Sequence, residues 1–324
     1  MTLRELNRTL LRRQLLLARS RVPVGKAVER LVALQAQYAP SPYVALWSRV
    51  EGFRKEQLTR ALAVGSIVKA GSLRTTLHVM ARDEYPYVAA AHAESVRGRT
   101  KHRLEVGMFP EGPLTQSEVM ALAAEILGTD DRWELAFALR PLPGVRTAPL
   151  GDWPHTKPSP FVLWREPLPD PQEAATRVVR AYLAAYGPAT RDDVQQFTGF
   201  RFRQIDPALE GLRDLGDGLF DLPRAARARG DERAPVRFLP GFDSVILAHR
   251  DRSRIVPPEY VEAVFNKQNG TTKNTFTVDG FVAGAWRVEK QRLVVEPFAP
   301  LPARVRREVD AEGERLLAWY LGQS

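Results

Sequence analysis

Two glutamines near the N-terminus, Gln35 and Gln37, are the residue pair best suited to chemistry. An amide side chain holds a water molecule through its C=O and NH₂ groups, although it is a weak base. Pro40 and Pro42 follow closely, so an expected helix over Val24–Leu34 must end before them. Side chains at i and i+2 face opposite ways on a helix but the same way on extended chain. The spacing alone favours two solvated amides at a helix end, and joint action requires extended backbone from about Gln35.

A second candidate group lies in Leu73–Met80, an expected strand in which polar and apolar residues alternate. On a strand, this alternation places Ser72, Arg74, Thr76 and His78 on one face. The functional interpretation is the edge of an active cleft that faces a phosphate or a sugar, with His78 supporting the reacting groups. An ordinary amphipathic strand explains the alternation equally well.

Basic side chains gather at two further places. Arginine forks match phosphate oxygens, so the run 249–254 is a candidate phosphate-binding loop. A solvated turn in which Asp251 pairs with a neighbouring arginine is the alternative. Two more arginines stand where a recognition helix is expected to begin and to touch the DNA backbone. The candidate DNA-binding residues are Arg201, Arg203, His249, Arg250, Arg252 and Arg254.

Composition narrows the function classes. The 324 residues contain no cysteine, which excludes disulfides, thiolate catalysis and cysteine-ligated zinc. No two histidines have the spacing of a helical metal pair. The phosphate-binding GxxxxGK[ST] loop of ATPases and the GxSxG nucleophile elbow of α/β-hydrolases are both absent. A net charge of +9, from 47 Lys+Arg against 38 Asp+Glu, favours a polyanionic partner. A GC-rich genome would raise the arginine content in the same way.

The clearest supporting unit lies in the second half of the chain. Gly187 and Pro188 break its first helix, and Thr190 caps its second. The order of two helices, a turn, a helix and a strand pair is that of a winged helix. We expect helices over Pro171–Tyr186, Thr190–Gly199 and Asp206–Leu215, then a strand over Leu219–Leu222.

Two weaker copies precede this unit. The nearer one begins at a capping box of Thr115 and Glu118. Its expected elements are helices over Thr115–Leu127 and Trp133–Leu139 and strands over Gly144–Leu150 and Phe161–Trp164, around a proline-rich tip at 151–160. The first copy adds helices over Leu3–Ala18 and Lys55–Ala63 to the helix and strand named above.

From Val236 the pattern changes to strands. Asp279-Gly280 is a strong two-residue hairpin signal. We expect strands over Val245–Leu247, Thr275–Val278, Phe281–Arg287 and Arg292–Glu296, and a final helix over Pro302–Leu321. The expected fold class is α+β, with three tandem winged-helix units (1–105, 106–168 and 169–235) and a C-terminal β-rich, barrel-like domain with a terminal helix (236–324).

Several motifs occur in the order of one known family. Gln35-Ala36-Gln37 resembles the Gln-x-Gln signature of the AlkZ-like DNA glycosylases, a bacterial family of tandem winged helices. A sister branch has an acid at the second position, so Gln37 indicates the Gln-x-Gln branch. The other matching segments are Pro42-Tyr43 with Leu46-Trp47, Arg74–His78, Tyr182-Leu183 with Gly187–Thr190, Leu239–Asp243 with Asp251–Arg254, and Asp279–Phe281 with Gly284 and Trp286. The resemblance spans nearly the whole chain, and its collinear order is more specific than any one motif.

The resemblance implies a monofunctional DNA glycosylase for cationic N7-alkylated purines, including those in interstrand crosslinks. Gln35 and Gln37 would be its catalytic residues. A cationic base leaves as a neutral molecule, so a positioned water and a stabilised oxocarbenium-like sugar matter more than acid catalysis. No lysine in these motifs is suited to Schiff-base lyase chemistry.

The expected partner is double-stranded DNA with alkylated bases. We expect a soluble monomer in the bacterial cytoplasm, associated with the nucleoid, with no cofactor, no metal and no membrane contact. The alternative is a non-catalytic winged-helix DNA-binding protein, either a transcription regulator or a resistance protein that sequesters lesions. A glycosylase releases free 7-methylguanine and leaves abasic sites, whereas a binder only shifts DNA in a gel.

Overall fold

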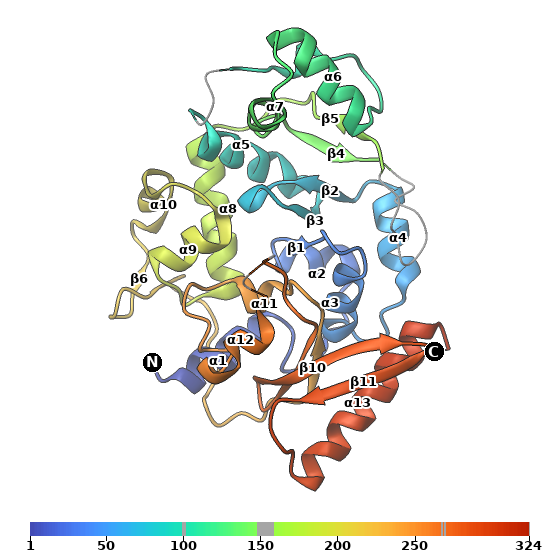
Figure 1. Ribbon diagram of the computed structural model, residues 1–324. Coiled ribbons are helices and arrows are strands. Elements are labelled where there is room, and N and C mark those ends of the chain that lie inside the picture. Colours follow the sequence, from blue (N-terminus) through green and yellow to red (C-terminus); the bar gives the residue numbers. More distant parts are fainter. Residues whose placement is uncertain (99–101, 148–158, 267, 269, 324) are drawn as a thin grey trace.

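The computed structural model describes residues 1–98, 102–147, 159–266, 268 and 270–323, and its fold is α+β (Figure 1). The N-terminal region begins with α1, which Thr2 and Glu5 cap as a capping box. α2 ends at Arg30, earlier than the sequence predicted, and a short strand follows. The elements here are α1 (Leu3–Arg13), α2 (Val24–Arg30), β1 (Leu34–Gln35), α3 (Ser41–Arg49), α4 (Lys55–Ala63), β2 (Ile67–Gly71), the 3₁₀ turn η1 (Leu73–Thr75), β3 (Leu77–Ala81), the 3₁₀ turn η2 (Arg82–Glu84) and α5 (Tyr85–Val96).

One sheet joins the first two expected units. Its strand order is β1-β3-β2-β4-β5, and the Ala70–Val145 pair connects β2 to β4. The capping box at Thr115 is confirmed. Part of the expected proline-rich tip and of the strand before it, 148–158, lies outside the described residues. The second unit contains η3 (Val106–Met108), α6 (Gln116–Leu127), α7 (Arg132–Leu139), β4 (Gly144–Arg146) and β5 (Phe161–Leu163).

The third unit follows the expected order of elements with one shift. Its elements are α8 (Pro171–Tyr186), α9 (Arg191–Thr198), α10 (Phe202–Leu209), β6 (Arg213–Asp214) and β7 (Phe220–Asp221). The helix predicted over Asp206–Leu215 was misplaced, because Arg201 and Gln204 start α10 earlier and Gly211 has a φ of 72° that ends it. β6 and β7 pair as a two-stranded antiparallel sheet. Tyr182 and Tyr186 on α8 stack at 5.3 Å between ring centroids and pack against Phe197 of α9.

The C-terminal domain carries an open antiparallel sheet in the order β11-β10-β9-β8. The described strands form no closed barrel, so the barrel-like expectation is not confirmed. The strand predicted over Val245–Leu247 is wrong, because Asp243 caps a short helix there by accepting from the N–H of Val245. The Asp279-Gly280 hairpin is confirmed. The elements are β8 (Arg237–Leu239), α11 (Ser244–Leu247), η4 (Pro258–Tyr260), α12 (Val261–Val264), β9 (Thr275–Val278), β10 (Phe281–Glu289), β11 (Arg292–Pro297) and α13 (Ala303–Leu321).

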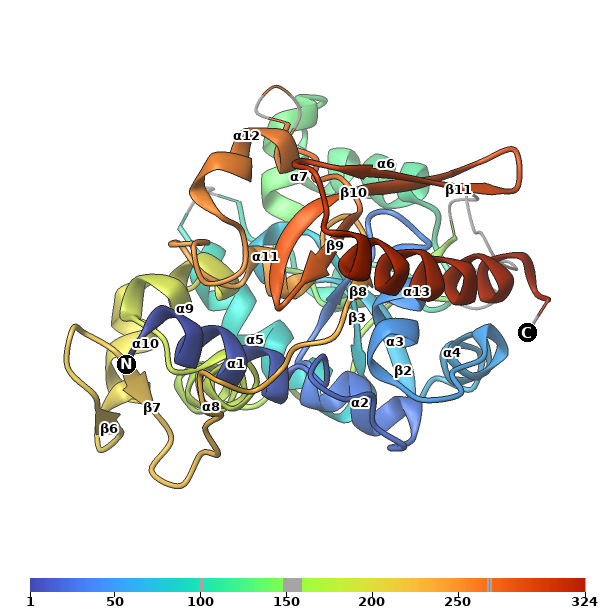
Figure 2. The ribbon, with the colours of Figure 1, turned by 90° about the horizontal axis from the view of Figure 1, so that it is seen from below.

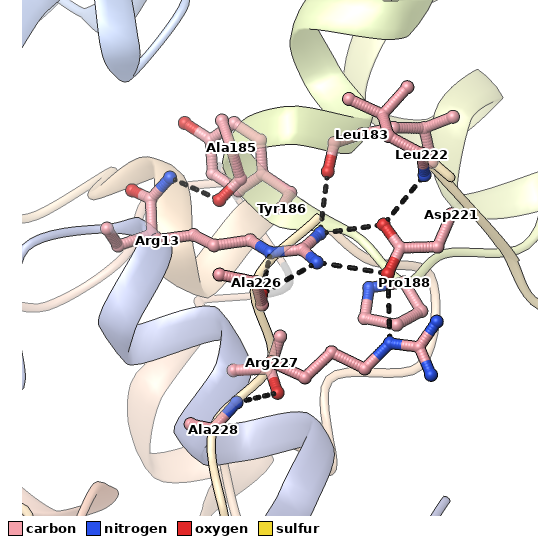
Figure 3. Close-up of polar contacts among 12 residues, drawn as sticks. Arg13, Leu183, Ala185, Tyr186, Pro188, Asp221, Leu222, Ala226, Arg227 and Ala228 are labelled. Carbon is pink, nitrogen blue, oxygen red and sulfur yellow. Dashed lines mark hydrogen bonds and ion pairs between the residues drawn. The ribbon is translucent and has the colours of Figure 1, made fainter. Parts of the chain in front are cut away.

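Helix α1 ties the third unit to the C-terminal domain and lies beside α8 (Figure 2). The Arg13 guanidinium, which is buried, donates to both carboxylate oxygens of Asp221, at 2.9 and 3.0 Å, and to the carbonyl of Leu183 at 2.9 Å (Figure 3). Nearly two helical turns earlier, Asn7 donates to the carbonyls of Arg254 and Gly280. No helix in the described ranges is long and apolar enough to span a bilayer.

Candidate active site

The Gln35 and Gln37 side chains meet at the end of β1. The backbone is extended here, because β1 pairs with β3 and the N–H of Ala36 donates to the Leu77 carbonyl at 2.7 Å. Nε2 of Gln35 donates to Oε1 of Gln37 at 2.7 Å. The extended backbone expected at this position is therefore confirmed, and the two amides lie on one side of the chain.

The two amides differ in their exposure. Gln35 is only 6% exposed, whereas Gln37 is an exposed residue. Oε1 of Gln35 is buried and makes no hydrogen bond within the described protein. A buried polar atom of this kind usually finds its partner in a water molecule or a ligand. The pair thus presents one oriented, buried acceptor next to an exposed amide.

Helix α3 and the C-terminal domain hold the segment after Gln37 in place. The Arg49 guanidinium and the Asp243 carboxylate form a fully buried two-point ion pair, with N–O distances of 2.8 and 2.7 Å. At the other end of α3, the Ser41 hydroxyl donates to the Gly241 carbonyl at 2.7 Å. Pro42 occupies the first turn of α3, where proline is favourable. The N-terminal side of the segment that carries the two glutamines is therefore held by pairing with β3, and its C-terminal side is held by the contacts of α3 with the C-terminal domain.

A cavity of about 660 Å³ opens beside Gln37 and Tyr38. Its size falls in the usual range of small-molecule sites, about 300–1,000 Å³. The Tyr38 side chain is 49% exposed, and its hydroxyl interacts with that of Tyr320 on α13. The opposite wall comes from the C-terminal domain and includes Phe242, Thr272, Lys273, Asn274, Trp286 and Glu296.

That opposite wall is built by hydrogen bonds between two loops. The N–H of Gly241 donates to Oδ1 of Asn274 at 2.6 Å, and the N–H of Phe242 donates to Oγ1 of Thr272 at 2.5 Å. The Trp286 indole donates to the carbonyls of Leu239 and Thr275. These bonds join residues that line the cavity beside Gln37. The sequence motifs Leu239–Asp243 and Asp279–Trp286 signalled this region, but their spacing did not show that it would meet the glutamines.

His78 stands directly opposite Gln35 in the β1–β3 pair. It is 1% exposed, and its Nδ1 lies 3.1 Å from both the Ser72 hydroxyl and the Thr76 carbonyl. Burial, chiefly, lowers the pKa of His78 to about 3, and the charge of Arg74 acts in the same direction. His78 is therefore neutral at physiological pH.

Comparison with known proteins decides the family of this site. The family described as DNA glycosylase AlkZ-like matches residues 28–319. The chain belongs to the AlkZ-like DNA glycosylase family. It is thus an enzyme of the DNA glycosylase type, and the reading as a non-catalytic DNA binder is not favoured.

A curated relative and a solved structure that resemble this chain both come from Streptomyces sahachiroi. An interstrand DNA cross-link repair glycosylase is 26% identical over 334 aligned positions, which cover 89% of this chain and 88% of that protein. The solved structure of the DNA glycosylase AlkZ superposes with a TM-score of 0.80 at 23% identity, over 99% of this chain and 97% of that one. The structural likeness shows that the two proteins share a fold.

In this AlkZ-like glycosylase, Arg74 does not lie on a polar strand face. The strand predicted over Leu73–Met80 starts only at Leu77, because Arg74 and Thr75 have φ angles of 53° and 61° and form η1. The Arg74 guanidinium donates to the Phe197 carbonyl and lies 5.4 Å from the Phe197 ring centroid. Burial lowers the pKa of Arg74 to about 10. Its observed contacts join the first and third units.

Thr76 also has a local partner. Its hydroxyl donates to the Leu73 carbonyl at 3.2 Å, which closes the turn of η1. Of the three residues expected beside the cleft, the structure brings only His78 next to the glutamine pair, through the strand register. The positive φ angles of η1 break the alternation on which the grouping of Arg74, Thr76 and His78 depended.

The two ends of the run 249–254, His249 and Arg254, are buried, so the run is not a wholly exposed basic loop. His249 is 1% exposed, with Nε2 3.1 Å from the Tyr186 carbonyl, and burial lowers its pKa well below the usual value. Arg254 is 6% exposed and donates to the Pro188 carbonyl at 2.8 Å. Burial does not fit the phosphate-binding role that the sequence suggested for His249 and Arg254. Both residues instead hold the third unit against the C-terminal domain.

The remaining arginines of this group differ in their accessibility. Arg250 is exposed and pairs with Asp192 at 2.9 Å. Arg252 is half-buried, with its guanidinium 4.1 Å from the Phe265 ring centroid. The alternative pairing of Asp251 with an arginine is not what the structure has, since Asp251 accepts from Ser253.

Arg201 and Arg203 fix α10 to α5. Arg201 donates to the carbonyls of Ser95 and Arg97, and Arg203 pairs with Glu94 at 2.7 Å. Arg203 keeps an exposed guanidinium and stays a candidate for a phosphate contact, whereas the head group of Arg201 is bound to the protein. Among the described residues, no group of three histidine, aspartate or glutamate side chains has a geometry for a metal ion.

Proposed function

We propose that this glycosylase hydrolyses the N-glycosidic bond of cationic N7-alkylated purines in double-stranded DNA, including purines joined in interstrand crosslinks. The observation that carries this proposal is the Gln35–Gln37 hydrogen bond, which leaves the buried Oε1 of Gln35 as an oriented acceptor. The name of the crosslink-repair relative supports the crosslink part of the proposal.

In the proposed reaction, Gln35 Oε1 accepts a hydrogen bond from the water that attacks C1′ of the sugar. The C1′–N9 bond breaks, and its electron pair passes to the base, where it cancels the positive charge. The water oxygen forms a bond to C1′ and keeps one proton as the new hydroxyl group, and the other proton passes to solvent, because an amide is too weak a base to keep it. The amide acts by orienting the water toward the developing oxocarbenium carbon.

Gln37 has the supporting part in this proposal. Its Oε1 holds the Gln35 amide in one orientation, and its own side chain borders the cavity of about 660 Å³. We propose that the alkylated base occupies this cavity, with the exposed Tyr38 ring on one side of it. A cationic purine is attracted to an aromatic face, which favours this placement.

The test uses a duplex with a single N7-methylguanine and a second duplex with one N7–N7 interstrand crosslink. We expect free 7-methylguanine, alkali-labile abasic sites, and conversion of the crosslinked duplex into separable strands. Gln35→Ala should abolish most of this activity, whereas Gln57→Ala, which changes an amide on α4, should retain it. DNA binding without release of any base from either duplex would refute the proposed function.

A further inference from the structure

His78 is linked to Gln35 by the backbone register. In an antiparallel pair, side chains directly opposite each other lie on the same face, with Cβ atoms about 4.5–5.5 Å apart. Gln35 and His78 are such a pair. Both residues are buried, so neither side chain can turn out to solvent.

The His78 ring is held in a defined tautomer. The Thr76 carbonyl can only accept a hydrogen bond, so Nδ1 at 3.1 Å from it must carry the proton. Ser72, which is fully buried, lies 3.1 Å from the same nitrogen and gives it a second polar contact. In the neutral ring, Nε2 then bears a lone pair.

The Gln35 amide has too few hydrogen bonds of its own to fix its orientation. One of its two N–H bonds is directed to Gln37, and its carbonyl oxygen is buried with no protein partner. An amide held by a single hydrogen bond retains freedom to rotate, and a misplacement of about 1 Å can cost about 100-fold in rate.

We propose that His78 is a positioning residue that packs against the Gln35 side chain and fixes the direction of its carbonyl oxygen. This inference rests on the proposed function. His78 acts through Gln35 and transfers no proton. The burial of the ring and the nearby Arg74 and His92 side chains all disfavour the charged imidazolium, in agreement with this role.

The experiment is a double-mutant cycle measured by single-turnover release of 7-methylguanine. His78→Asn keeps an N–H near the position of Nδ1 and removes the far half of the ring. We expect its rate to fall about 10- to 100-fold with DNA affinity unchanged. In the Gln35→Ala background, the same substitution should change the rate by less than about twofold, because the residue through which it acts is gone.

Controls separate a positioning role from loss of packing. His249→Asn also replaces a fully buried histidine and should lower the melting temperature with little effect on the rate. Should His78→Asn fail to fold, Ser72→Ala removes only one contact of Nδ1 and should slow release about 3- to 10-fold. The rate of the wild type should not titrate between about pH 5.5 and pH 8, around the usual histidine pKa.

The outcomes are distinct. A full rate in His78→Asn, or losses that multiply with Gln35→Ala, would overturn the positioning role while leaving the proposed function intact. A titration near pH 6.5 that disappears in His78→Asn would also overturn it, because His78 would then be a proton donor. A full rate in Gln35→Ala would instead refute the catalytic assignment on which the inference rests.

Discussion

Replacing Gln37 with alanine tests the glutamine pair most directly. Gln37 is exposed and lies after β1 in a bend, so truncation should cost no more than about 0.5 kcal/mol of stability. The substitution removes the acceptor that lies 2.7 Å from Gln35 Nε2. Gln35 would then have neither of its polar atoms bonded to protein, although it stays buried. The expected phenotype is a folded protein in which the Gln35 amide is no longer held in one orientation.

The size of the effect follows from the role of that hydrogen bond. Removing one preorganised hydrogen-bonding group from an active site costs about 2–4 kcal/mol of barrier, or about 30- to 1,000-fold in rate. An uncharged amide adds little to phosphate binding, so DNA affinity should change less than about threefold. The loss should therefore appear in the chemical step alone.

The assay is single-turnover release of 7-methylguanine with enzyme in saturating excess, beside fluorescence anisotropy for binding. Gln35→Ala should show a similar loss, and the double variant should be far less impaired than the product of the two. Because Gln35 is buried, its variant also needs a melting curve. Wild-type rates in both single variants would refute the reasoning and place the active site elsewhere.

Four further predictions concern binding and stability. Affinity for undamaged duplex should fall steeply with salt. Arg250 is exposed, and Arg250→Ala should flatten the slope of log affinity against log salt by about one unit, as expected for the loss of one phosphate contact. An unchanged slope would show that Arg250 does not contact a phosphate. Arg254→Met should lower the free energy of unfolding by about 3 kcal/mol in urea titrations, because it breaks buried contacts to the Pro188 carbonyl, and should leave the salt slope as it is. The pKa of His249 is near 6.5 in the unfolded chain and well below that in the folded protein. Below about pH 6.5 the unfolded chain therefore binds more protons, and the free energy of unfolding falls as the pH drops, by up to about 1.4 kcal/mol per pH unit. Urea titrations at pH 7.5 and 5.5 should show a smaller loss of unfolding free energy for His249→Asn than for the wild type. Gly280→Ala should cost at least about 2 kcal/mol, seen as a lower melting temperature, because Gly280 has a φ of 83° and a Cβ there would clash with α1.

Local signals in the sequence predicted the elements that depend on neighbouring residues. Thr115 and Thr190 begin helices because each bonds the backbone three residues later. Asp279-Gly280 makes a hairpin because both residues adopt positive φ angles. The extended backbone from Gln35 also followed from local sequence, since the chain cannot remain helical into Pro40 and Pro42.

Features that depend on distant residues could not be predicted. The prolines end one helix, but Pro42 also begins α3, and this helix was missed because proline suits a first turn. Three apolar residues at Val245–Leu247 fit a strand or a helix, and the Asp243 cap decides between them. The charge of Arg254 indicated an exposed loop. In the structure the Arg254 guanidinium is buried, where it pairs with Asp193 and donates to the Pro188 carbonyl.

The contacts of α1 have a consequence for the order in which the protein is made. Asn7 leaves the ribosome well before its two backbone acceptors, which lie 247 and 273 positions later in the chain. Asp221, the ion-pair partner of Arg13, likewise lies 208 positions later in the chain. Until those segments are synthesised, the nascent helix carries polar groups that have only water as a partner. A ribosome-bound chain that stops before the Asp279-Gly280 hairpin should therefore remain open to proteases at α1, and protection of α1 should appear only after the hairpin has been synthesised.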